Sequence, residues 1–172
     1  MKTLVIHAED STTDFLSTIY QDKDWTIVKK NIGKSKLKSL IKTHDIIIMM
    51  GHGTKKGLVD GDFNFIIDGQ YVYLLKDKIS IGIWCNADQF FNKHKLKGLA
   101  TGMIISEYLE ANLYCVNATY QEIEDSNIEF AKAVKESLLL DDLKSTKDMI
   151  QEKYKVKDKV TEFNQKNIYF YE

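Results

Sequence analysis

The stretch Asp45–Gly53 constrains the fold more than any other part of the chain. It contains five consecutive apolar residues, Ile46 to Met50, followed by Gly51-His52-Gly53. A short apolar run that ends at turn residues is typical of a strand buried on both faces, as in the interior of a parallel sheet. The two glycines leave little side-chain cover around the histidine, so we expect its imidazole to be accessible at the end of this strand.

A second stretch has the same design. Ile79–Cys85 is apolar almost throughout, ends at a cysteine and is followed by the polar residue Asn86. If this strand lies beside the strand Ile46–Met50 and runs parallel to it, His52 and Cys85 reach the same carboxyl edge of the sheet. Ligands and chemistry gather at that edge in open α/β sheets.

The first half of the chain alternates between strand-like and helix-like segments. This alternation predicts an α/β domain of three layers, with helices on both faces of a mainly parallel central sheet of five or six strands. The further expected strands are Thr3–His7, Trp25–Val28, Thr101–Ser106 and Tyr114–Asn117. The expected helices run from Ser11 or Thr12 to about Tyr20, over Lys34–Lys42, over Asp88–Lys97 with Gly98 as its C-cap, over Glu107–Asn112 as a short helix or turn, and over Ile123–Leu140.

Two Asp-Gly pairs lie between the two apolar stretches. Asp60-Gly61 and Asp68-Gly69 separate β-rich runs and predict a small hairpin insertion, followed by a short helical piece near residues 74–77. Residues 144–172 read as a helical extension, with a possible last strand over Asn167–Tyr171. No linker or repeat divides the chain, so we expect residues 1–172 to form a single domain.

Composition narrows the function classes. The chain has 172 residues, 44% hydrophobic and 28% charged, with a formal net charge of −1, which disfavours an electrostatic nucleic-acid binder. No apolar run approaches the roughly 20 residues that a membrane-spanning helix needs. Cys85 and Cys115 are the only cysteines, which favours free thiols and a cytoplasmic location, and their spacing suits no zinc site. We therefore expect no metal and no cofactor.

The order of these motifs resembles the caspase–gingipain superfamily of cysteine peptidases (clan CD, including CHAT domains). The resemblance rests on an apolar block before His52-Gly53, a second apolar block before Cys85 about thirty residues later, and a long helix after them. It covers roughly residues 1 to 140. It implies a caspase-like fold and cleavage of peptide or protein substrates by a dyad of Cys85 and His52, with the backbone amides of Gly53 and Cys85 as the oxyanion hole.

The chemistry of the two side chains supports this interpretation independently. A thiol attacks only as thiolate, and an imidazole or a helix N-terminus beside it raises the ionised fraction. His52 would then protonate the leaving amine. The alternative for Cys85 is a small buried side chain at a strand end. Cys115 has no comparable context and is expected in the core, so an alkylating agent should label Cys85 first.

Four further residues are candidates for substrate binding. Glu9 and Asp10 leave the first strand at the same edge, a region that often helps to build the specificity pocket of clan CD enzymes. An acidic pair there favours Lys or Arg before the cut bond, although acids that cap a helix are the simpler explanation. Trp84 would be core or pocket wall, and Asp88 would lie in the first turn of a helix.

Two alternative functions remain open. The short chain and Trp84, where many members of the superfamily have a small or acidic residue, favour a catalytically inactive relative that serves as a binding or scaffold module. A flavodoxin-like domain would also explain the alternation of strands and helices. That alternative predicts a ligand at the exit of the first strand instead of a Cys/His groove.

Overall fold

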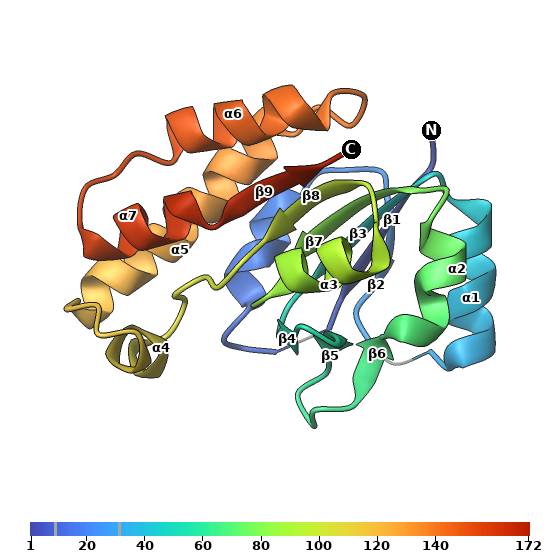
Figure 1. The fold of residues 1–172 in the computed structure, drawn as a ribbon, viewed down its shortest axis with the longest axis horizontal. Coiled ribbons are helices and arrows are strands. Elements are labelled where there is room, and N and C mark those ends of the chain that lie inside the picture. Colours follow the sequence, from blue (N-terminus) through green and yellow to red (C-terminus); the bar gives the residue numbers. More distant parts are fainter. Residues whose placement is uncertain (9, 31) are drawn as a thin grey trace.

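A computed structural model describes residues 1–8, 10–30 and 32–172 of the chain. Its centre is a six-stranded sheet of order β2-β1-β3-β7-β8-β9, in which the first five strands are parallel and the last is antiparallel (Figure 1). The strands are β1 Thr3–His7, β2 Thr26–Val28, β3 Ile46–Met50, β7 Ile79–Ile83, β8 Gly98–Thr101 and β9 Ile168–Tyr171. A small antiparallel sheet lies beside it, made of β4 Gly53–Thr54, β5 Gly57–Val59 and β6 Phe65–Ile67.

The strand β3 shows how the layers form. All five of its residues are buried, and they alternate between two apolar clusters on opposite faces of the sheet. Ile47 and Met49 face one cluster, whereas Ile48 and Met50 face the other, as the two-residue period of a strand requires. Both faces are therefore covered, which explains why the strand carries no polar residue.

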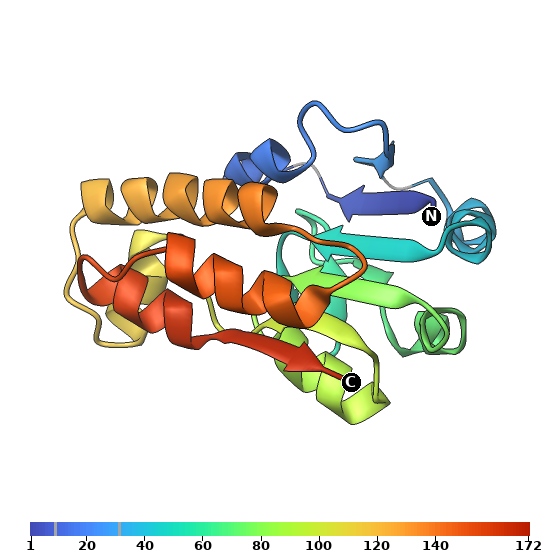
Figure 2. The same cartoon turned by 90° about the horizontal axis from the view of Figure 1, so that it is seen from above.

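Helices supply the two outer layers (Figure 2). The cluster that contains Ile47 and Met49 is covered by α1 Lys34–Thr43, by α2 Val72–Leu75, which continues the short 3₁₀ helix η2 Gly69–Tyr71, and by α3 Ala87–His94. The cluster on the opposite face, which contains Ile48 and Met50, is covered by the 3₁₀ helix η1 Asp14–Ile19, by α5 Tyr120–Ser137 and by α6 Leu143–Lys153. A third and smaller cluster joins α4 Tyr108–Leu113, the start of α5 and α7 Lys159–Lys166. The expected three-layer α/β architecture is confirmed.

The expected hairpin and last strand are also present. β5 and β6 pair antiparallel across the turn that contains Asp60-Gly61, and β9 pairs with β8. The second pair, Asp68-Gly69, makes no hairpin. Asp68 instead accepts a hydrogen bond from the Gln70 amide at the start of the short 3₁₀ helix Gly69–Tyr71.

The prediction was wrong after α3. The fifth central strand is Gly98–Thr101 and not Thr101–Ser106, and Lys95, with φ 53°, ends α3 in place of Gly98. Gly98 pairs with Ser80, and a Cβ built on it would lie 1.8 Å from the Ser80 carbonyl oxygen. The glycine therefore permits close strand pairing, a role that looks the same in sequence as a helix stop.

Other boundaries differ for local reasons. Residues Tyr114–Asn117 form no strand. Helix α5 begins at Tyr120, earlier than expected, because Thr119 and Glu122 form a capping box. The first helix is a short 3₁₀ helix that begins after Thr13 without a side-chain cap. The hydroxyl of Thr12 is used elsewhere, in contacts with Asp10 and His52.

Candidate functional site: the Cys85 and His52 edge of the sheet

Strand register places His52 and Cys85 at equivalent positions. β3 and β7 are parallel neighbours, and Met50 pairs with Ile83, so each candidate follows its paired residue by two positions. The Gly51 amide donates a 3.1 Å hydrogen bond to the Ile83 carbonyl, which extends the ladder beyond the strands. The histidine and the cysteine therefore leave adjacent strands at the same edge, as the sequence predicts.

Both side chains line one small cavity, here called the dyad cavity. Its volume is about 30 Å³, room for about one water molecule. The cavity is lined by Thr13, Phe15, Leu16, Gly51, His52, Ile83, Trp84, Cys85, Thr101, Ile104, Ser106 and Phe130. In this closed state it is too small for a substrate side chain, and His52 and Cys85 share no hydrogen bond.

His52 is held by two residues that follow β1. Its Nε2 atom lies 2.7 Å from Thr12 Oγ1 and 3.5 Å from Asp10 Oδ1. The Thr12 hydroxyl donates its only proton to Asp10 Oδ1 at 2.6 Å, so Nε2 must be the donor to Thr12. Hydrogen bonds from Thr12 also hold the pKa of Asp10 below its ordinary value. In neutral His52 the basic lone pair therefore lies on Nδ1.

Cys85 is partly buried and has partners of its own. Its Sγ atom lies 3.7 Å from both the Ile104 carbonyl oxygen and Glu110 Oε1, so these two acceptors share its single proton. Burial, and after it the charge of the Glu110 carboxylate, raises the pKa of the Cys85 thiol to about 12. The resting thiol is therefore protonated at neutral pH, unlike an activated nucleophile.

Glu110 is fixed by the turn that carries it. It is the third residue of α4, and its Oε2 atom accepts hydrogen bonds from the amides of Ser106 and Glu107 and from the Ser106 hydroxyl. This capping arrangement leaves Oε1 directed at Cys85. The segment after β8 thus crosses the carboxyl edge of the sheet and brings a carboxylate to the thiol.

Two backbone amides lie beside the pair. The Val59 amide donates to the His52 carbonyl, and the next cross-strand pair is Gly53 with Leu58. Because bonded and non-bonded pairs alternate in an antiparallel ladder, the Gly53 amide points away from β5. The amide of Cys85 has no hydrogen-bond acceptor among the described residues. Both are donors of the kind an oxyanion hole requires.

The remaining sequence candidates lie in different surroundings. Trp84 is 2% exposed, packs edge-on against Phe90 and donates its indole N–H to the Thr54 carbonyl, so it forms a wall of the dyad cavity. Asp88 is half-buried on α3, does not line that cavity, and has its pKa raised by burial. Glu9 lies outside the described residues. Cys115, expected in the core, is exposed in the turn after α4.

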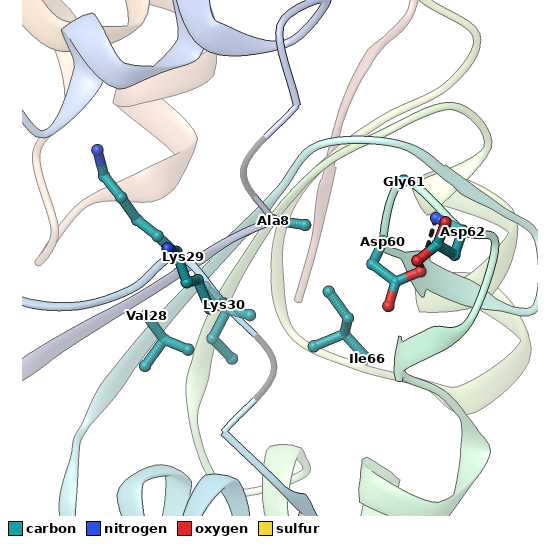
Figure 3. A pocket seen from close by; sticks show the side chains of 9 residues that line it. Ala8, Val28, Lys29, Lys30, Asp60, Gly61, Asp62 and Ile66 are labelled. Atoms are coloured by element: carbon teal, nitrogen blue, oxygen red, sulfur yellow. Dashed lines mark hydrogen bonds between the residues drawn. The ribbon is translucent and has the colours of Figure 1, made fainter.

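A larger pocket opens at the exits of β1 and β2 (Figure 3), here called the β1–β2 pocket. Its volume is about 330 Å³, at the lower end of the range for small-molecule sites. It is lined by Ile6, Ala8, Val28, Lys29, Lys30, Asp60, Gly61, Asp62 and Ile66. In Figure 3 the side chain of Lys29 extends away from the two acidic residues of the lining, Asp60 and Asp62, while Lys30 also lines the pocket.

The two cavities are neighbours. A Cβ built on Gly61 would lie 3.4 Å from Asp10 Oδ2, while Asp10 Oδ1 contacts His52. The carboxylate of Asp10 therefore separates the β1–β2 pocket from the imidazole. Within residues 1–8, 10–30 and 32–172, no group of three or more His, Cys, Asp or Glu side chains is arranged to hold a metal ion.

Comparison with known proteins adds no relative: no family model, curated protein or solved structure matches this chain. A search for membrane-spanning segments finds no helix in the described chain that is both long and apolar enough to cross a bilayer.

Sequence reasoning missed two residues of the site. Thr12 was expected only as a helix cap, although its spacing from Asp10 is that of a local Asp–Thr turn. Glu110 stands three residues after Glu107, a spacing that indicates a helix start. No local pattern shows that this helix start lies against Cys85, because that contact depends on the path of the chain after β8.

Proposed function

We propose that this protein is a cysteine peptidase with a caspase-like fold, in which Cys85 is the nucleophile and His52 the general acid and base. The observation that carries the proposal is the strand register, which delivers both side chains to one cavity at the carboxyl edge. A thiol and an imidazole at one edge are the components of acyl transfer.

The reaction requires the thiol to leave its resting position. After rotation toward the cavity, Cys85 gives its proton to Nδ1 of His52 and the thiolate attacks the carbonyl carbon of the scissile bond. His52 then protonates the leaving amine, and water hydrolyses the thioester in a second step. The amides of Gly53 and Cys85 are positioned to stabilise the oxyanion of each tetrahedral intermediate.

Asp10 acts through His52 in this proposal. Its ionised carboxylate keeps the Thr12 hydroxyl pointing away from Nε2, which leaves the lone pair of the imidazole on Nδ1. This is the orienting role that a third residue takes in triads of nucleophile, base and acid. Asp10 is then a positioning residue and not a direct substrate contact, the role first considered for it.

We further propose a preference for a basic residue before the cut bond. The support is the β1–β2 pocket, which Asp60 and Asp62 line together with Lys29 and Lys30, and whose Gly61 lies close to Asp10 Oδ2. Its apolar lining of Ile6, Val28 and Ile66 suits the aliphatic stem of a Lys or Arg side chain, and its two carboxylates suit the cationic end. Free thiols at Cys85 and Cys115 fit a reducing compartment, and the cytoplasm is our proposed location.

A second candidate, an inactive binding module of the same fold, is favoured by the protonated state of Cys85. The contact with Glu110 is the specific observation in its support. The two candidates differ in one measurable property, since only the first requires the thiol to attack a carbonyl group.

The test is cleavage of a fluorogenic peptide library by the full chain, with Cys85→Ala, His52→Ala and the control Cys115→Ser. We expect the first two variants to lose cleavage and the control to retain it. Absence of cleavage and of any adduct with a peptidyl chloromethyl ketone, both in the wild type and in Glu110→Gln, which removes the charge beside the thiol, would support the binding module instead. Activity that survives Cys85→Ala would contradict the proposal directly.

A further inference from the structure

The resting thiol of Cys85 makes its hydrogen-bond contacts with groups other than its proposed base. Its two hydrogen-bond acceptors are the Ile104 carbonyl and Glu110 Oε1, and both belong to the segment after β8. His52 is engaged at the same time with Thr12 and Asp10. The components of the dyad therefore lie in one cavity, and each is held by a different set of contacts.

The Glu110 carboxylate opposes ionisation of the thiol in two ways. Its negative charge, 3.7 Å from the sulfur, disfavours a second negative charge in a partly buried place. Its Oε1 atom is also an acceptor for the thiol proton, together with the Ile104 carbonyl, and this favours the protonated form. Glu107 adds charge from the same turn but makes no hydrogen bond to the sulfur.

Two buried or half-buried amides anchor the segment that leads to Glu110. Asn164 of α7 bonds both the amide and the carbonyl of Ile105, and Asn127 of α5 donates to the Ser106 carbonyl. These bonds define where α4 starts, so the position of the carboxylate is determined by the packed body of the protein.

Helix α4 packs on α5 and α7, where Tyr108 stacks on Tyr120, and not on the central sheet. It has six residues, of which Ala111 is the buried one, and its cluster is separate from the two clusters that flank the sheet. Leu109 and Leu113 are 78% and 76% exposed. Displacing α4 would therefore expose little buried apolar area from the helix itself. It would break the hydrogen bonds from Ser106 and Glu107 to Glu110 and remove the carboxylate from the thiol.

We propose that Glu110 is an autoinhibitory residue, which holds Cys85 in its unreactive form until α4 is displaced. This inference rests on the proposed function, because a restraint on the nucleophile has a purpose only if Cys85 attacks a substrate. It explains why a chain with a histidine and a cysteine at one sheet edge carries a carboxylate against the sulfur. The substitution Glu110→Gln removes the charge and keeps an oxygen that can accept from Ser106 and Glu107.

The experiment measures alkylation of Cys85 by iodoacetamide as a function of pH, in the full chain with Cys115→Ser and with mass-spectrometric readout. We expect Glu110→Gln to shift the inflection to lower pH and to raise the rate at pH 8 by about tenfold for each unit by which the thiol pKa falls. The matched control Glu107→Gln removes the same charge from the same turn and is expected to raise the rate much less. Peptide cleavage should increase in parallel with Glu110→Gln.

Several results would overturn the proposal that Glu110 restrains the thiol of Cys85. An unchanged pH profile in Glu110→Gln, or an equal increase in Glu107→Gln, would show that the contact does not control the thiol. If circular dichroism shows that Glu110→Gln does not fold, Glu110→Asp replaces it, since the shorter carboxylate keeps the charge but withdraws from the sulfur, and an unchanged rate again contradicts the proposal. Alkylation is independent of proteolysis: faster alkylation without peptide cleavage rejects the peptidase and keeps the restraint on the thiol.

Discussion

Asp10 and His52 are joined through Thr12: Oδ1 of the carboxylate lies 3.5 Å from Nε2 of the ring, and the Thr12 hydroxyl is within hydrogen-bond distance of both atoms. The pair joins the exit of β1 to the exit of β3. Because the Thr12 hydroxyl is committed to Asp10, the arrangement selects one tautomer of the imidazole. It also leaves the opposite nitrogen available for chemistry.

Asp10→Asn should lower peptide cleavage through the tautomer of His52. Without the carboxylate, the Thr12 hydroxyl can donate to Nε2, and the ring proton moves to Nδ1, where it blocks proton transfer from the thiol. We expect kcat to fall by about 10²-fold with little change in KM. The measurement is steady-state kinetics, and Thr12→Ser, which retains the hydroxyl, should stay near wild type. A loss confined to KM would indicate substrate binding by Asp10 instead.

The same variant should show a pH-dependent loss of stability. The pKa of Asp10 is lowered from 3.8 by hydrogen bonds from Thr12, so the folded state favours the ionised form. A depressed carboxyl pKa contributes stability above the unfolded pKa, and this contribution is lost as the pH falls through the folded pKa. Urea unfolding should therefore show Asp10→Asn less stable than wild type at pH 7, with the difference shrinking below about pH 4. A difference that persists unchanged at pH 3 would contradict this assignment.

Much of the fold follows from local sequence. The apolar runs of β3 and β7 predict buried parallel strands because no polar residue interrupts them, and the register then places His52 and Cys85 together. The strand Gly98–Thr101 was displaced in the prediction because Gly98 indicates a helix stop equally well. Gly98 is required because the backbone of Ser80 in the neighbouring strand lies close to it, and the sequence around Gly98 carries no sign of that contact.

The environment of the site was less predictable. A thiol beside an imidazole suggests an ionised nucleophile, whereas the sulfur contacts Glu110, twenty-five positions away in the chain. Cys115 was expected in the core as a typical free cysteine, but it follows α4 with φ 55° in an exposed turn. The preferred order of alkylation is therefore reversed in the resting protein, where Cys115 should react first.

Gly53→Ala should disturb the wall of the dyad cavity. A Cβ at this position would lie 2.1 Å from Trp84 Cδ1 and 2.8 Å from the Gly57 carbonyl oxygen, so the indole must move. We expect a loss of about 1–3 kcal/mol in the free energy of unfolding and a shift in tryptophan emission. Gly69→Ala is the control, because its Cβ would meet only the His94 ring at 3.9 Å. Equal stability of the two variants would show that the close approach is relieved without cost.

Asp62→Asn should reduce the preference for basic substrates. Asp62 is exposed and lines the β1–β2 pocket together with Asp60. Removing its charge weakens the attraction of the pocket for a Lys or Arg side chain. We expect kcat/KM for such substrates to fall by about fivefold, with neutral substrates unaffected, since an exposed ion pair contributes up to about 1 kcal/mol. Asp77→Asn makes the same charge change at the opposite edge of the sheet. A panel in which both variants behave alike would reject the pocket as the specificity site.

Asn164→Ala should destabilise the protein and loosen the segment over Cys85. The Asn164 side chain is 1% exposed and satisfies both the amide and the carbonyl of Ile105, at 2.7 and 2.9 Å. Leaving these buried groups unpaired costs about 1–3 kcal/mol each, so we expect a loss of about 2–5 kcal/mol in chemical unfolding. The exposed helical residue Asn92 provides the control, since Asn92→Ala should change stability by no more than about 0.5 kcal/mol. The segment bonded by Asn164 carries Ile104 and leads to Glu110, so Cys85 should also be alkylated faster in Asn164→Ala. Destabilisation without faster alkylation would show that the hydrogen bonds of Asn164 do not control the reactivity of the thiol.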